Sequence, residues 1–84
     1  MGVHLPNFFC DKQVKIVYLL CQGLEPAEVS ETLDLKISYV YNKLYDAYKF
    51  LELKNRVQLV VKYYTDEPFR THIDARYESL QAKA

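Results

Sequence analysis

The sequence predicts an all-α fold, a small bundle of four to five helices. Three observations favour this fold class. Apolar residues recur every three or four positions along most of the chain, which is the period of an amphipathic helix. No Asn-Gly or Asp-Gly dipeptide is present to mark a β-hairpin. The length of 84 residues suits one domain, so we expect residues 1–84 to form a single unit.

The first helix is predicted over residues 11–22. Asp11 can accept the free N–H groups of its first turn, and Gly23 can end it in a left-handed conformation at low cost. We expect a single buried face. Three apolar residues at i, i+3 and i+7 form it, Val14, Val17 and Cys21, with Ile16 and Leu20 beside them.

A second helix is predicted to begin at Pro26, because proline is well tolerated in the first turn of a helix. Glu25 and Glu28 complement the positive end of the helix dipole. Val29 and Leu33 form its inner stripe. Asp34, Leu35 and Lys36 then make a tight connection to the next helix.

The third helix is predicted over residues 37–51. Its inner stripe is Val40, Leu44, Ala47 and Leu51, and its opposite face shows Ser38, Tyr41, Asn42, Tyr45 and Lys49. Two helices joined by three residues, the second of them longer, are typical of a helix-turn-helix, in which the second helix enters the major groove of DNA. Spacing alone is equally compatible with another small helical bundle.

Two further helices are predicted after residue 54. The fourth spans about residues 55–64, with Val57, Val60, Val61 and Tyr64 apolar. The segment Asp66-Glu67-Pro68 breaks the chain. The fifth helix, at about residues 69–82, carries an apolar stripe of Phe69, Ile73, Tyr77 and Leu80.

The net charge is zero but unevenly spread. Residues 36–62 hold six basic against two acidic side chains, whereas both flanking segments are acidic. A basic middle segment is compatible with an anionic partner there. The balance falls short of the strongly basic composition of a typical nucleic-acid-binding domain, and a solvated face of mixed charge explains it equally well.

Other function classes find little support. The chain has no Gly-rich phosphate loop and no HExxH or GxSxG motif, so we expect no enzyme and no cofactor. Cys10 and Cys21 form no CxxC pair, and His4 and His72 are scattered, so we expect no metal site. No apolar run is long enough to span a bilayer, and the N-terminus lacks the pattern of a signal peptide, so we expect a cytoplasmic protein.

The run LLCQGLEPAEVSETLDLKISYVYNKLYDAYKFLELKNRVQLV resembles the DNA-binding domain of the LuxR/GerE family of bacterial transcription regulators. The resemblance is ungapped over about residues 9–64, and its most specific part is Leu53-Lys54-Asn55-Arg56. The matching positions are Leu19, Leu20, Gly23, Glu28, Val29, Leu33, Leu35, Val40, Leu44, Leu51, Asn55, Arg56 and Val57.

This resemblance implies a helix-turn-helix core over about residues 9–64, to which the fifth helix is an addition. It also implies a homodimer formed through the fourth helix. Leu59 and Tyr63 lie outside the apolar stripe expected to face the core, so they are available for an interface. The expected dimer-interface residues are Leu59, Val60, Tyr63 and Tyr64.

The sequence departs from the family where family members touch DNA. At four of these positions the residue usual in the family is replaced, here by Ala27, Lys36, Tyr39 and Tyr41. Lysine side chains nevertheless stay on or beside the exposed side of the third helix, and an asparagine there can pair with adenine. The expected DNA-contact residues are Lys36, Ser38, Tyr41, Asn42, Lys43, Tyr45 and Lys49.

Two functions therefore stay open. The first is a small transcription regulator that binds double-stranded DNA as a dimer. The second is a protein-interaction module on the same scaffold, which binds or silences another transcription regulator through its Tyr-rich third helix. Exposed tyrosines such as Tyr41 and Tyr45 are common in protein interfaces, because they offer a large contact area at low entropy cost.

Overall fold

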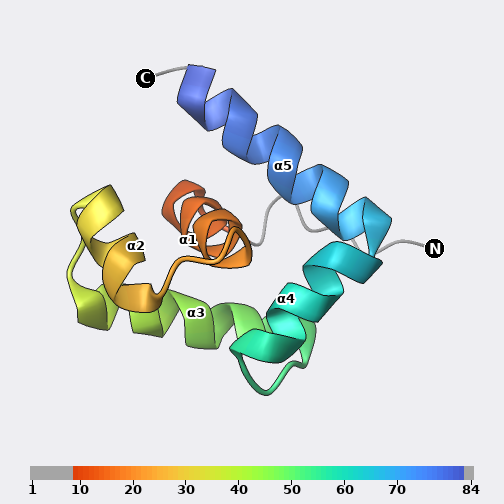
Figure 1. Ribbon diagram of the computed structural model, residues 1–84, viewed down its shortest axis with the longest axis horizontal. Helices are drawn as coiled ribbons and strands as arrows, with labels where there is room; N and C mark the ends of the chain where they lie inside the picture. Colours follow the sequence, from red (N-terminus) through yellow and green to blue (C-terminus); the bar gives the residue numbers. More distant parts are fainter. Residues whose placement is uncertain (1–8, 83–84) are drawn as a thin grey trace.

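The computed structural model describes residues 9–82, and within this range every regular element is a helix. The prediction of an all-α bundle is confirmed (Figure 1). His4 and the N-terminal pattern considered above lie outside the described residues. The helices are α1 (Asp11–Cys21), α2 (Pro26–Leu33), α3 (Ile37–Leu51), α4 (Arg56–Thr65) and α5 (Glu67–Ala82).

Helix α1 is the centre of the bundle. It packs against each of the other four helices, and in Figure 1 it is seen close to end-on with those helices around it. The prediction of one buried face is therefore wrong, because neighbours cover α1 on several sides. Seven of its eleven residues are buried: Gln13, Val14, Ile16, Val17, Leu19, Leu20 and Cys21.

The start of α1 differs from the prediction, whereas its end agrees with it. Asp11 does not cap the helix, since Cys10 is the N-cap and no side-chain cap bond forms. Its carboxylate instead accepts a hydrogen bond from Arg76 Nη2 at 2.9 Å, which ties α1 to α5. Gly23 does adopt a positive φ of 105°, as expected, and there the chain leaves α1.

Helices α2 and α3 are joined by the predicted tight connection over residues 34–36. Glu25 and Glu28 cap α2 reciprocally, and Pro26 stands in its first turn. Asp34 ends α2 in the left-handed region at φ 56°, where its short polar side chain is tolerated. Helix α3 has the predicted bounds, and Val40, Leu44 and Ala47 of its inner stripe are buried.

Helix α4 buries a different face from the one predicted. Leu59 and Tyr63, expected at the surface, are 0% and 3% exposed, whereas the three apolar residues Val57, Val61 and Tyr64 are more than half exposed. The reason is that α1 and α5 both pack against α4, on the side that carries Leu59 and Tyr63. The Tyr63 hydroxyl donates a hydrogen bond to Asp74 of α5.

Helix α5 is part of the same core. Its residues Phe69 and Ile73 are buried in one cluster with the apolar residues of the other helices. Tyr77 stacks on Tyr18 of α1, with ring centroids 3.8 Å apart. The buried apolar residues of the described chain form a single core to which all five helices contribute. None of these helices is long and apolar enough to cross a membrane.

Candidate nucleic-acid interface

Helix α3 presents a continuous exposed stripe on the side away from the core. Its inner face packs on α1 and α2, and the helix runs along one edge of the molecule (Figure 1). The stripe consists of residues at i, i+4, i+7 and i+11, which share one helix face and are all exposed. These residues are Ser38, Asn42, Tyr45 and Lys49. Four of the seven predicted DNA-contact residues are thus brought together.

Tyr41 lies on the flank of this stripe. Its ring centroid is 6.1 Å from that of Tyr45, and Tyr45 is 6.2 Å from the half-buried Tyr48. Tyr41 and Tyr45 are 42% and 57% exposed. Aromatic rings at these separations support one another and form a rigid surface. The third helix therefore carries an aromatic flank beside its polar stripe.

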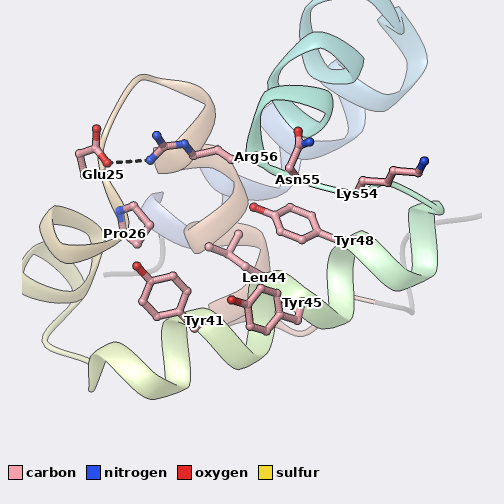
Figure 2. Close-up of a pocket in the computed structure, with 9 residues that line it drawn as sticks. All are labelled: Glu25, Pro26, Tyr41, Leu44, Tyr45, Tyr48, Lys54, Asn55 and Arg56. Carbon is pink, nitrogen blue, oxygen red and sulfur yellow. Dashed lines mark hydrogen bonds and ion pairs between the residues drawn. The ribbon is translucent and has the colours of Figure 1, made fainter.

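The aromatic flank forms one wall of an open hollow of about 460 Å³ (Figure 2). The opposite side comes from the first residues of α2 and α4. The lining residues are Glu25, Pro26, Tyr41, Leu44, Tyr45, Tyr48, Lys54, Asn55 and Arg56. The hollow thus combines an aromatic wall with a carboxylate, an amide and two cationic side chains.

The segment Lys54-Asn55-Arg56 has a structural role at this hollow. Asn55 Oδ1 accepts a hydrogen bond from the backbone N–H of Gln58 at 3.0 Å, which caps α4. Arg56 Nη1 donates to Glu25 Oε1 at 2.7 Å and links α4 to the start of α2. This hydrogen bond also raises the pKa of Arg56. Lys54 forms no ion pair within residues 9–82, and its side chain extends outward from the rim of the hollow (Figure 2).

Two of the predicted lysines lie away from the exposed stripe. Lys36 stands at the N-cap of α3, where its side chain is exposed. Lys43 is half-buried on the flank facing α1. The Lys43 ammonium lies 5.4 Å from the ring centroid of Tyr39. Lys36 thus lies at the start of α3 and Lys43 on its flank, and neither belongs to the exposed stripe.

Sequence reasoning missed a lysine from outside the helix-turn-helix. The ammonium of Lys12, in α1, lies 5.9 Å from the centroid of the same Tyr39 ring. Lys12 belongs to the acidic N-terminal segment and is 27 positions from Tyr39 in the chain. No pattern of spacing could have paired them, because their proximity depends on how α1 packs on α3.

The predicted dimer surface is only partly exposed, because α4 buries a different face from the one expected. Leu59 and Tyr63 are core residues, so neither is available to a second chain in this fold. Val60 is half-buried, and Tyr64 alone of the four is exposed. The exposed apolar strip of α4 is instead Val57, Val61 and Tyr64, at i, i+4 and i+7.

Comparisons with protein-family models, with curated proteins and with solved structures found no match to this chain. The resemblance to LuxR/GerE domains therefore stays a prediction that depends on the positions quoted above. Within residues 9–82, no three or more His, Cys, Asp or Glu side chains are grouped so that they could hold a metal ion.

Proposed function

We propose that this chain is a small DNA-binding transcription regulator of the bacterial cytoplasm, with α3 in the major groove. The observation that carries the proposal is the exposed stripe on the second helix of a helix-turn-helix. In such folds the second helix is the one inserted into the groove. Its inner face is held by α1 and α2, so the outer face is presented by a rigid support.

The side chains of the stripe suit the reading of base edges. The Asn42 amide can pair bidentately with adenine, and Ser38 can bond several bases. Tyr45 can contact a thymine methyl group with its ring or a phosphate with its hydroxyl. Lys36 and Lys49 lie near the two ends of α3, where they can contact phosphates of the groove walls.

We propose a symmetric dimer formed through α4. The exposed strip of Val57, Val61 and Tyr64 lies on one helix face, and self-complementary pairing of such a face is the commonest route to a dimer. A dimer would present two copies of α3 to successive half-sites, as other helix-turn-helix dimers do.

Fluorescence anisotropy with a mixed-sequence DNA duplex tests the proposal. We expect binding at low salt that weakens as salt rises, because phosphate contacts release counterions. Lys49→Gln should weaken binding, and Lys62→Gln is the matched control, because the Lys62 ammonium is already bound to Asp66 at 2.7 Å. No binding by the wild type at low salt would refute the function.

A second candidate function is favoured by the hollow beside Tyr41 and Tyr45. An exposed aromatic pair next to a hollow is typical of a protein-binding hot spot, and the partner would be another transcription regulator. The double variant Tyr41→Ala/Tyr45→Ala should then lose the partner in affinity capture, while Lys49→Gln keeps it. Loss of the partner with Lys49→Gln alone would contradict this candidate.

A further inference from the structure

Three side chains from two helices form a cationic cluster on the flank of α3 that faces α1. The ammonium groups of Lys12 and Lys43 lie 5.9 Å and 5.4 Å from the centroid of the Tyr39 ring. The face of an aromatic ring is electron-rich and attracts cations. Two ammonium groups from different helices therefore lie beside one tyrosine ring.

The position of the cluster is fixed by the packing of the two helices. Gln13, next to Lys12, donates a hydrogen bond from Nε2 to the carbonyl oxygen of Lys43 at 2.9 Å. Gln13 is buried, so this bond joins α1 to α3 from inside the bundle. Lys12 itself is exposed and reaches solvent.

The charge of the cluster is not balanced by the protein. Neither Lys12 nor Lys43 forms an ion pair with a carboxylate of the described residues. The neighbouring Asp11 is bound to Arg76, and Asp46, one turn along α3 from Lys43, is exposed and forms no ion pair with it. An anion beside the Tyr39 ring would therefore meet two ammonium groups that have no carboxylate partner.

We propose that Lys12, Tyr39 and Lys43 bind one backbone phosphate of DNA. This inference rests on the proposed DNA-binding function and adds a contact from α1, outside the helix-turn-helix. A helix lying in the major groove has one phosphate strand on each flank, and the cluster occupies the flank of α3 towards α1. The two ammonium groups supply the charge, and the Tyr39 hydroxyl can donate a hydrogen bond to a phosphate oxygen.

The test is the salt dependence of DNA binding by charge-removing variants. Anisotropy titrations with a mixed-sequence duplex would run between about 50 and about 200 mM salt, where phosphate contacts dominate the change in affinity. The variants are Lys12→Gln, Lys43→Gln, the double variant of these two lysines and the matched control Lys15→Gln. Lys15 lies on the same helix but not over the Tyr39 ring. Far-UV circular dichroism confirms that each variant is folded.

We expect the double variant Lys12→Gln/Lys43→Gln to make the plot of log K against log salt less steep by about 0.9 per protomer, the amount for one lost phosphate contact. Each single variant should reduce the steepness by less, because the other lysine stays at the same phosphate. Lys15→Gln should leave the slope nearly unchanged. Sequence preference should stay the same in every variant, because phosphate contacts carry no base information.

The other outcomes are distinguishable. Wild-type binding with an unchanged slope in the double variant Lys12→Gln/Lys43→Gln would overturn the phosphate site and leave the DNA-binding function intact. An equal loss in Lys15→Gln would assign the effect to net charge and overturn the site as well. Absence of wild-type binding would overturn the DNA-binding function itself, and the phosphate site with it.

Discussion

The Gln13 side chain of α1 donates a hydrogen bond to the backbone carbonyl oxygen of Lys43 in α3, over 2.9 Å. Gln13 is the only buried residue with an amide or charged side chain among the described residues, at 6% exposure. A buried amide is costly unless it is hydrogen-bonded, and this one bonds the helix that we place in the groove. The bond therefore helps to fix how α3 is oriented on the central helix.

Gln13→Ala should destabilise the protein by about 1–3 kcal/mol, the usual cost of losing a buried hydrogen bond. Urea unfolding followed by circular dichroism measures this. The control is Gln81→Ala, an exposed glutamine of α5, for which we expect a change within about 0.5 kcal/mol. Equal unfolding midpoints for the two variants would show that the Gln13 bond contributes nothing.

Two variants separate the core face of α4 from its exposed strip. Leu59→Ala should cost about 2–5 kcal/mol, because Leu59 is fully buried. Val61→Asp should lower the free energy of unfolding by less than Leu59→Ala, because Val61 is 53% exposed and loses only the contacts of the proposed dimer. In sedimentation, we expect the wild type as a dimer and Val61→Asp as a folded monomer. A dimeric Val61→Asp, or a monomeric wild type, would refute the proposed interface.

The two cysteines should differ in their reaction with a disulfide reagent. Cys10 is exposed, whereas Cys21 is buried. Burial, followed by the nearby Asp74 carboxylate, raises the pKa of the Cys21 thiol to about 12. Because the thiolate is the reactive form, we expect one thiol to react quickly in the native protein and the second only in urea. A Cys10→Ala variant that still reacts quickly would contradict this assignment.

Alkaline pH should destabilise the fold. The pKa of Cys21 is higher in the folded chain than the value of about 8.5 in an unfolded one, so the unfolded state loses its proton first. Stability is therefore full below that lower value and falls as pH rises towards 12, by at most about 1.4 kcal/mol per pH unit. Desolvation raises the pKa of Tyr63 and Tyr48 as well, which adds to the loss at higher pH.

Urea midpoints between about pH 7 and about pH 10.5 measure this loss. The Cys21→Ala variant should show a shallower fall with pH than the wild type. Parallel curves for the two proteins would show that Cys21 does not contribute to the alkaline loss.

Mild acid should also destabilise the fold, through His72. Burial, and then the positive charge of Arg76, lower the pKa of this histidine, and its Nε2 atom is buried without a hydrogen-bond partner among the described residues. Its protonation is thus harder in the folded state. Stability is full above the unfolded pKa of about 6.5 and falls as pH drops below it.

Thermal unfolding between about pH 7.5 and about pH 5 checks the His72 prediction, since carboxylates stay ionised in that range. His72→Leu cannot be protonated and should show a smaller loss of Tm than the wild type. An identical loss in both proteins would rule out His72 as the cause.

Local signals predicted most of the helix boundaries. Gly23 and Pro26 mark the end of α1 and the start of α2, and α3 has the predicted bounds, because caps and turns depend on neighbours in the chain. The inner stripe of α3 was also predicted, since Ser38, Asn42 and Lys49 leave it only one apolar side. The exposed stripe of α3 follows from the same pattern.

The packing of distant helices decided the rest. Helix α4 carries apolar residues on two sides, so periodicity alone does not predict which side is buried. Leu59 is buried and Val61 is exposed because α1 and α5 pack on the side that carries Leu59. The same holds for the ion pair of Glu25 with Arg56 and for the two lysines over Tyr39. Amphipathicity is a local property of a sequence, whereas the partner of each face is set by the tertiary fold.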